Sequence, residues 1–224
     1  MKRITVLLAD DHVVVRQGLC ALLTSEGDIE VVAEAENGRQ AVALAKKTSP
    51  DVVVMDVAMP LLNGAEATRQ ILKNVPGSKV LVLSSYGDDE CVSQLMQAGA
   101  AGYLLKQSAA NDLLKAIREV NSGHAFFSPV IARRLRDQYH DAFTNGQAPK
   151  KTGELSSREA EVLQLIAEGK PNKQVAAELG VSFKTVDKHR QHLMGKLGIH
   201  DIAGLTRYAI AEGIIESNVR VTIR

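Results

Sequence analysis

Polar residues that could do chemistry follow four short apolar runs in the first half of the chain. Asp10 and Asp11 come directly after ITVLLA, Asp56 after VVVM, Ser84 after KVLVL and Lys106 after GYLL. In an open α/β sheet the carboxyl ends of parallel strands converge on one crevice, so these groups are expected to meet there. Three carboxylates, one hydroxyl and one ammonium group together are typical of a site for a metal ion and a phosphoryl group.

The three carboxylates favour a hard divalent cation. Asp10, Asp11 and Asp56 would repel one another if left unpaired, and Mg²⁺ bound by a few carboxylates keeps waters that a phosphoryl group can replace. Lys106 supplies a point charge for a phosphate oxygen, and Ser84 supplies a hydroxyl that can bond to one. Taken singly, these residues also fit a helix N-cap, a solvated lysine and a turn serine.

Two other sites use the same sheet edge. Dinucleotide binding needs a glycine-rich turn after the first strand, and the segment Ala9–His12 carries two carboxylates there that would repel a pyrophosphate. Aspartate-nucleophile phosphatases have a D-x-D motif, in which a second carboxylate lies two residues after the nucleophile and acts as acid and base. That position is Ala58, so Asp56 can be phosphorylated but the customary group for rapid turnover is missing.

The elements that must position these residues alternate between strands and helices. Runs such as VLLA and VLVL are apolar on both faces, as expected of parallel strands covered by helices on both sides. This predicts an α/β fold, a flavodoxin-like doubly wound five-stranded parallel sheet. The expected strands are residues 4–9, 29–35, 51–55, 79–84 and 101–105, and the expected helices are residues 12–24, 38–48, 64–74, 88–98 and 109–122.

The second half of the chain has only helical patterns. A connecting helix is expected over residues 129–139, and the Gly- and Pro-containing segment 144–153 reads as a flexible linker. A small all-α four-helix domain follows. Its helices are expected from the Ser156 or Ser157 cap to about Glu168, over Asn172 to Leu179, from Ser182 to near Gly198, and over Asp201 to Glu212. The predicted domains are therefore residues 1–122 and 153–224, joined by a linker over residues 123–152.

Composition and charge are those of an ordinary globular protein. The chain has 224 residues, 45% hydrophobic and 24% charged, with a net charge of +1. No stretch approaches 18 uninterrupted apolar residues and no cleavable leader precedes the first strand, so a cytoplasmic protein without a membrane span is expected. Cys20 and Cys91 show no metal or redox spacing and are interpreted as packing residues. Residues 1–149 carry a net charge of −2 and residues 150–224 a net charge of +3, which permits nucleic-acid binding without establishing it.

The first domain resembles the receiver domain of two-component response regulators. The resemblance rests on Asp10-Asp11, Asp56 followed by Pro60 and Gly64, Ser84, and Tyr103 before Lys106, and it covers about residues 1–122. It implies that Asp56 accepts a phosphoryl group from a sensor histidine kinase. It also implies that Asp10, Asp11, Asp56 and the backbone carbonyl of Ala58 hold Mg²⁺.

The resemblance also implies a switch. Ser84 would move toward the phosphoryl group, and Tyr103 would rotate inward behind it. This would bias a two-state equilibrium on the face made by the expected fourth helix, fifth strand and fifth helix of the first domain. Tyr86, two residues after Ser84, is expected to hinder the hydrolytic water.

The second domain has the order of a helix-turn-helix, in which the second helix enters the major groove of DNA. Its residues from Leu155 to Leu197 resemble the LuxR-type DNA-binding domain almost position by position, over about residues 153–215. The resemblance implies phosphate contacts at the start of the recognition helix and base contacts along its exposed face. Asp187 could accept from a cytosine amine or weaken nonspecific binding. The expected DNA-binding residues are Lys184, Thr185, Asp187, Lys188, Arg190, Gln191 and His192.

Together these features are similar to a response regulator of the NarL/FixJ subfamily. Phosphorylation of Asp56 is expected to release an interdomain contact, to favour a homodimer through the last helix, and to control binding to promoter DNA. RNA polymerase is a further candidate partner, and no membrane partner and no enzymatic turnover beyond slow self-dephosphorylation are expected. A phosphorylation-independent DNA-binding regulator with a vestigial receiver, or an aspartate-nucleophile phosphatase, are the alternatives.

Overall fold

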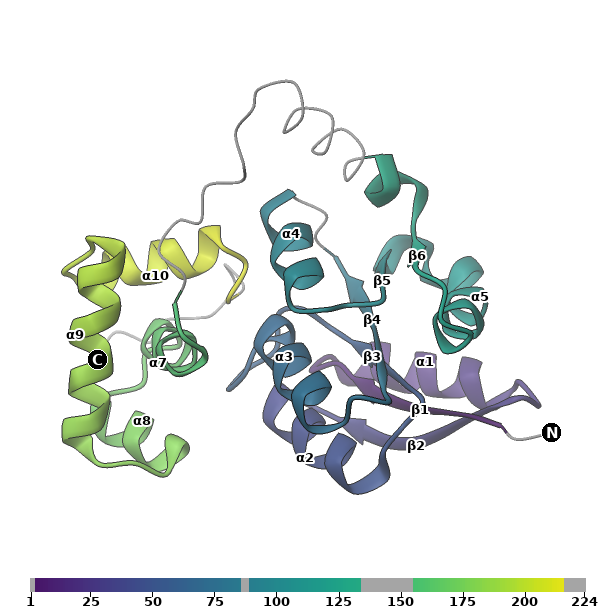
Figure 1. The fold of residues 1–224 in the computed structure, drawn as a ribbon, viewed down its shortest axis with the longest axis horizontal. Coiled ribbons are helices and arrows are strands. Elements are labelled where there is room, and N and C mark those ends of the chain that lie inside the picture. The colour runs from purple at the N-terminus through teal and green to yellow at the C-terminus, as the bar shows by residue number, and fades with distance from the viewer. Residues whose placement is uncertain (1–2, 86–88, 134–154, 216–224) are drawn as a thin grey trace.

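The computed structural model describes residues 3–85, 89–133 and 155–215 (Figure 1). Its first part is a parallel sheet of six strands in the order β2-β1-β3-β4-β5-β6. The predicted flavodoxin-like, doubly wound architecture is confirmed, with one strand more than expected. The strands are β1 (Ile4–Ala9), β2 (Ile29–Ala35), β3 (Val52–Met55), β4 (Lys79–Ser84), β5 (Gly102–Leu105) and β6 (Phe126–Phe127).

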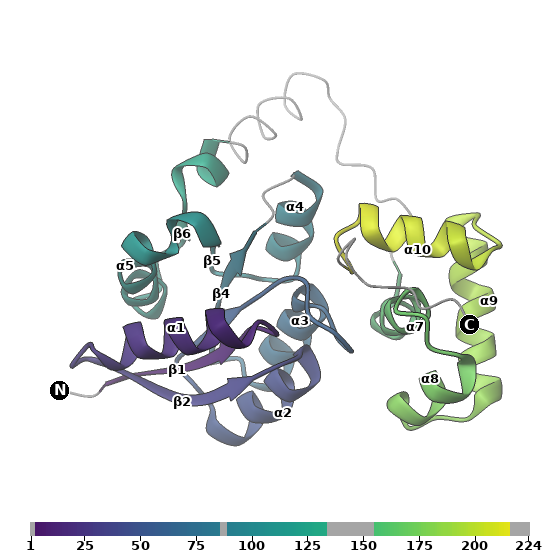
Figure 2. The same ribbon diagram turned by 180° about the vertical axis from the view of Figure 1, so that it is seen from behind.

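Helices cover both faces of this sheet because its central strands are apolar on both sides. Successive residues of β1 point to opposite faces: Leu8 packs in a core cluster with α1 and α5, and Leu7 in one with α2 and α3. Figures 1 and 2 show α1 and α5 on one side and α2, α3 and α4 on the other. These helices are α1 (Val13–Thr24), α2 (Gly38–Thr48), α3 (Gly64–Asn74), α4 (Asp89–Gln97) and α5 (Ala109–Asn121), with a short 3-10 turn, η1 (Lys106–Ser108), after β5.

The sixth strand extends the sheet at its β5 edge. Phe126 and Phe127 pair in parallel with Gly102 and Tyr103, and Ser128 then leads into helical residues from Pro129 to Arg133. The start of the expected connecting helix is therefore helical, while the rest of it and the expected linker lie outside the described residues.

The second part consists of four described helices around one apolar core. Ser156 caps α7 in a capping box with Glu159, as its sequence predicts, and Ser182 caps α9. Gly180 and Gly198 end α8 and α9 in the left-handed conformation that glycine adopts readily. The four helices are α7 (Ser157–Ala167), α8 (Asn172–Leu179), α9 (Phe183–Leu197) and α10 (Ile202–Ala211).

The two parts contact each other through α7. In both views α7 lies between α9 and the sheet part, and α9 lies on the far side (Figures 1 and 2). Helix α7 packs against α3, and side chains of α7 reach the loop of residues 57–63 between β3 and α3, referred to below as the β3–α3 loop. Among the described helices, none is long and apolar enough to cross a membrane.

Candidate phosphoacceptor site and nucleic-acid interface

The strand-end residues predicted from the sequence meet at the carboxyl edge of the sheet. Lys106 Nζ lies 2.8 Å from Asp10 Oδ2 and 2.8 Å from Asp56 Oδ2, so one ammonium group bridges two carboxylates from β1 and β3. Both carboxylates are buried, with residue exposures of 2% and 4%. Asp56 Oδ1 accepts a hydrogen bond from the Val57 backbone N–H at 2.8 Å. This bond fixes the orientation of the Asp56 carboxylate and leaves its Oδ2 facing the Lys106 ammonium group.

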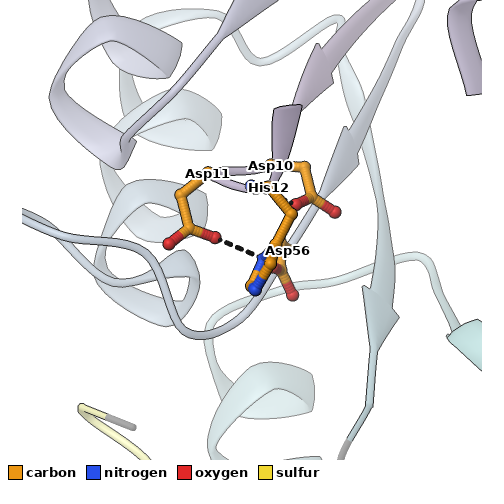
Figure 3. A group of neighbouring side chains, drawn as sticks. All are labelled: Asp10, Asp11, His12 and Asp56. Atoms are coloured by element: carbon orange, nitrogen blue, oxygen red, sulfur yellow. Dashed lines mark hydrogen bonds and ion pairs between the residues drawn. The ribbon is translucent and has the colours of Figure 1, made fainter. Parts of the chain in front are cut away.

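A wider group of possible metal ligands surrounds this pair. Asp10, Asp11, His12 and Asp56 each offer a ligand atom, and these atoms lie within 4.8 Å of one another (Figure 3). Two buried carboxylate oxygens, Asp10 Oδ2 and Asp11 Oδ1, meet the Lys106 ammonium and the His12 ring without a hydrogen bond of favourable geometry. Buried carboxylate oxygens in this condition are suited to a hard cation, because such an ion prefers charged oxygen ligands.

The backbone of Asp56 is held by a close approach of α3. The Gly64 N–H donates to the Val57 carbonyl at 2.7 Å, and a Cβ at Gly64 would lie 2.1 Å from the Asp56 carbonyl oxygen. Only glycine fits at this position without displacing backbone atoms. The Asp56 N–H in turn donates to the Ala9 carbonyl at 2.8 Å, which continues the sheet ladder to the predicted phosphoacceptor.

Burial dominates the electrostatics of the site. Desolvation raises the pKa of Asp56 from 3.8 to about 6, although the nearby Lys106 ammonium favours the ionised form. Asp10 adds a like charge that also raises the pKa of Asp56. Burial works against the charged form of Lys106, but the two carboxylates outweigh it and raise the pKa of Lys106. Lys106 therefore compensates only part of the negative charge of the three carboxylates, and a cation would neutralise the rest.

The other predicted residues of the site are buried beside it. Ser84 is fully buried at the end of β4, with no exposed surface. The Tyr103 side chain is also fully buried, and its hydroxyl lies 3.6 Å from Cys91 Sγ of α4. The inward position expected for Tyr103 in the switched state is thus already occupied in this structure, and its switching role stays a prediction. Tyr86 lies outside the described residues.

One residue of the site was missed in the sequence. Arg16 of α1 is buried, donates to the Asp10 backbone carbonyl at 2.6 Å and forms ion pairs with Glu34 and Glu36. It fixes the chain at the point where β1 ends. Its position one helical turn after His12 is the only sequence signal, and a charged residue at that spacing is usually solvated.

The recognition helix predicted from the sequence presents its polar face to solvent. Lys184, Lys188, Gln191 and His192 are exposed. The remaining predicted contacts are partly buried because they bond locally: the Gln191 amide donates to Asp187 at 3.2 Å, Arg190 donates to Asn172 at 3.3 Å, and Thr185 takes part in the Ser182 cap. On the opposite side of these helices, Val162, Val175, Val186 and Leu193 are buried in the apolar core of this part.

Comparison with known proteins identifies both parts. Residues 6–118 match the model of the response regulator receiver domain, and residues 153–209 match that of the bacterial regulatory proteins of the luxR family. The chain belongs to the response regulators with a LuxR-type output domain.

Similar response regulators match this chain over nearly their whole length. The chain is 40% identical over 206 residues to the transcriptional regulatory protein LiaR of Bacillus subtilis, covering 92% of this chain and 96% of LiaR. It is 36% identical over 217 residues to the response regulator VraR of Staphylococcus aureus, covering 95% of this chain and 99% of VraR. Among solved structures, RcsB of Salmonella enterica serovar Typhimurium bound to promoter rprA with the phosphomimetic BeF3⁻ is 26% identical, covers 92% of this chain and 98% of RcsB, and has a TM-score of 0.60.

In this response regulator, a polar face of α7 joins the LuxR-type domain to the receiver domain. Glu161 accepts from Arg39 of α2 at 3.2 Å and from Gln70 of α3 at 3.0 Å, and Ser157 bonds to the buried Glu66 of α3. Glu161 also pairs with Arg158 of its own helix. The face consists of Ser157, Glu161, Gln164 and Glu168.

The lower end of this polar face reaches the β3–α3 loop of the receiver. Gln164 is 1% exposed; its Nε2 donates to the Met59 carbonyl at 2.8 Å, and its Oε1 accepts from the Asn63 N–H at 2.7 Å. Glu168 Oε1 accepts from the Leu61 N–H at 3.0 Å. Burial raises the pKa of Glu168 despite these bonds. A second contact joins Gln94 of α4 to Glu212 at the end of α10 at 2.7 Å.

This interface escaped the sequence analysis for a definite reason. The residues of the polar face recur at spacings of 4, 3 and 4, which places them on one side of a helix whose other side is apolar. Such a pattern normally indicates a solvated face. Only the contact with another domain turns it into a buried set of hydrogen bonds, and half of its partners are backbone atoms that no side-chain pattern reveals.

Proposed function

We propose that this response regulator is phosphorylated on Asp56 by a sensor histidine kinase and controls transcription by binding promoter DNA through its LuxR-type domain. The observation that carries the proposal is the convergence of Asp10, Asp56 and Lys106, with 2.8 Å contacts, at the β3 end of a receiver domain. A buried carboxylate that retains a cationic partner and faces additional unneutralised oxygens is suited to accept a phosphoryl group.

The metal in this proposal is Mg²⁺. Asp10, Asp11, Asp56 and the backbone carbonyl of Ala58 would hold it, and the clustered buried oxygens of the first three support that assignment. When bound, the ion neutralises charge on the transferring phosphoryl group and leaves water positions for its oxygens. His12 lies in the same group of ligand atoms, but its imidazole is a softer donor than Mg²⁺ prefers.

The transfer step uses the remaining residues of the site. An Asp56 carboxylate oxygen attacks the phosphorus of the kinase phosphohistidine, an O–P bond forms as the N–P bond breaks, and the histidine nitrogen recovers its electron pair. Lys106 bonds to a phosphoryl oxygen in place of Asp56 Oδ2, and Ser84 donates its hydroxyl to another. The buried Tyr103, whose hydroxyl lies 3.6 Å from Cys91 Sγ of α4, would carry the change to α4, β5 and α5. Ala58 provides no acid or base for rapid hydrolysis, so the protein stores the phosphoryl group and is not a phosphatase.

The output in this proposal is the exposed face of α9. Lys184 and Thr185 contact phosphates, and Asp187, Lys188 and Gln191 face the bases, with Arg190 and His192 beside them. The apolar side chains Ile202 and Ile210, with exposures of 51% and 38%, mark the face of α10 that pairs two copies on an inverted repeat. Phosphorylation changes the contacts of α7 and α10 with the receiver and favours this homodimer.

The domain boundaries and the cytoplasmic location predicted from the sequence form part of this proposal. The receiver is assigned to residues 1–122, the linker to 123–152 and the DNA-binding domain to 153–224. Within the linker range, β6 pairs with β5 at the edge of the receiver sheet, and the helical residues from Pro129 follow it. The protein acts in the cytoplasm, where its kinase and promoter DNA are accessible, and RNA polymerase is its candidate partner at the promoter.

The test is phosphorylation of the full chain by acetyl phosphate with and without Mg²⁺, followed by DNA binding. We expect Mg²⁺-dependent labelling of wild type, no labelling of Asp56→Asn, and tighter binding of promoter fragments by the labelled protein. For the labelling step, Asp187→Asn serves as a matched control, since it makes the same chemical change far from the phosphoacceptor site. DNA binding without any labelling of wild type would favour a vestigial receiver, and sustained turnover of a generic phosphomonoester would favour a phosphatase.

A further inference from the structure

The β3–α3 loop is held from outside the receiver domain. Its Met59 carbonyl and its Leu61 and Asn63 N–H groups all bond to side chains of α7 rather than to receiver residues. Gln164 alone joins the two ends of the loop, because one amide group donates to Met59 and accepts from Asn63. Its Nε2 also lies 2.9 Å from Glu168 Oε1, which ties the two α7 side chains into one unit.

Leu61 adopts a backbone conformation that needs such support. Its φ is 68°, in the left-handed region that residues with a Cβ rarely occupy. A conformation of this kind persists only where the surroundings over-determine it. Here the surroundings include the LuxR-type domain itself, since the Leu61 side chain packs against that domain's apolar core and its N–H bonds to Glu168.

The same loop is rigidly connected to the phosphoacceptor. A Cβ at Gly38 of α2 would lie 2.1 Å from the Leu62 carbonyl oxygen, and Gly64 approaches the Asp56 carbonyl equally closely. Ala58 stands between Asp56 and the held Met59, and it is only 9% exposed. A displacement of Met59 therefore moves the Ala58 carbonyl, the backbone oxygen assigned above to the metal.

We propose that Gln164 and Glu168 of the DNA-binding domain are positioning residues of the phosphoacceptor site, which hold the β3–α3 loop so that the Ala58 carbonyl is set to bind Mg²⁺. The inference rests on the proposed phosphoacceptor function. It makes the metal affinity of the receiver depend on a side-chain contact made by the other domain.

The physical reason is preorganisation. Without the two side chains, one carbonyl and two N–H groups of the loop lose their partners, and the left-handed conformation of Leu61 is held only by its apolar packing. The loop then samples other conformations, and binding the metal requires it to be ordered again. Outer partners of metal ligands typically change metal affinity by roughly 10-fold or more when removed, which sets the size of the effect.

The test compares variants of the full chain by isothermal titration calorimetry with MgCl₂. Gln164→Ala and Glu168→Ala are expected to weaken Mg²⁺ binding by roughly 10-fold. Glu168→Gln keeps an acceptor for the Leu61 N–H, so its Mg²⁺ affinity is expected to stay within about threefold of wild type. On a logarithmic scale this is less than half of the tenfold loss expected for the alanine variants. Gln94→Ala is the matched control, because it removes an interdomain hydrogen bond at α4 that does not touch the loop.

Hydrogen exchange supplies a readout that does not depend on metal or activity. Exchange of the Leu61 and Asn63 amides is expected to accelerate in both alanine variants and to stay slow in Glu168→Gln and Gln94→Ala. Unchanged Mg²⁺ affinity in alanine variants whose circular dichroism matches wild type would overturn the inference, as would equal weakening by Gln94→Ala. Failure of wild type to be labelled on Asp56 would instead overturn the proposed function, so the two outcomes are distinct.

Discussion

Replacing Asp56 by asparagine should make the metal-free protein more stable at neutral pH. Burial raises the pKa of Asp56 from 3.8 to about 6, so the folded protein holds this proton more tightly than the unfolded chain does. At pH 7 the carboxylate is nevertheless ionised, and its burial is unfavourable despite the 2.8 Å contact with Lys106. Asparagine has the same shape without the charge, and Lys106 keeps its partner Asp10.

The magnitude follows from the rise of about two pH units. At about 1.4 kcal/mol per unit, ionised Asp56 lowers the free energy of unfolding by about 3 kcal/mol at pH 7. The sign is that of a carboxyl group whose folded pKa is raised. Its favourable contribution is present at low pH and is lost as the pH rises from about 4 to about 6. The advantage of Asp56→Asn should therefore shrink to about 1 kcal/mol at pH 4.5, where Asp56 is largely protonated in the folded protein and still largely ionised in the unfolded chain.

The assay is urea unfolding followed by far-ultraviolet circular dichroism, since the chain has no tryptophan. Wild type, Asp56→Asn and the matched control Asp187→Asn are compared at pH 7 and pH 4.5, first in EDTA and then with MgCl₂. Magnesium should stabilise wild type and not Asp56→Asn, because the ion binds only the folded protein with its carboxylates intact. A variant less stable than wild type at pH 7 in EDTA, or a gain that is equal at both pH values, would refute the electrostatic reasoning.

Three further predictions concern single residues. Lys106→Ala should lower the free energy of unfolding in EDTA by about 3–5 kcal/mol, because Asp10 and Asp56 become buried charges without a partner, and MgCl₂ should restore part of it in the same urea assay. Gly64→Ala should cost several kcal/mol, about as much as other backbone clashes in a core, and should abolish acetyl phosphate labelling; wild-type stability would contradict the 2.1 Å approach to Asp56. Lys188→Ala should leave stability within about 0.5 kcal/mol and weaken promoter binding by roughly 1–3 kcal/mol, measured by fluorescence anisotropy at fixed salt; unchanged affinity would remove Lys188 from the interface.

The sheet and its strand-end chemistry could be predicted because they depend on local patterns and one geometric rule. Runs such as VVVM are apolar on both faces, which indicates buried parallel strands, and parallel strands end at the same edge. That rule is sufficient to bring Asp10, Asp56 and Lys106 together without knowledge of the loops between them. The helices of the second domain followed equally from caps at Ser156 and Ser182 and from terminal glycines.

The parts that could not be predicted depend on tertiary contact. Phe126 and Phe127 form a strand too short to show alternation, and they pair only because β5 leaves a free edge. Arg16 is buried because the Asp10 carbonyl accepts its hydrogen bond and Glu34 and Glu36 neutralise its charge. No helix or strand periodicity in the sequence relates Arg16 to these partners. Leu61 has a left-handed backbone conformation, but the sequence has no glycine or asparagine at this position that would have predicted it.

The exposure of α9 in this arrangement limits how phosphorylation can control output. Lys184, Lys188 and Gln191 face solvent while α7 is docked on the receiver, so docking does not cover these side chains, which are proposed to contact DNA. The apolar residue Ile202 on α10 is likewise exposed. For the homodimer proposed above, control would then act on how two DNA-binding domains are placed relative to each other, because a two-fold site requires its half-sites to be engaged at a fixed spacing. Among the contacts that the structure describes, the α7 contact with the β3–α3 loop and the α10 contact with α4 are points at which a change at Asp56 would alter that placement.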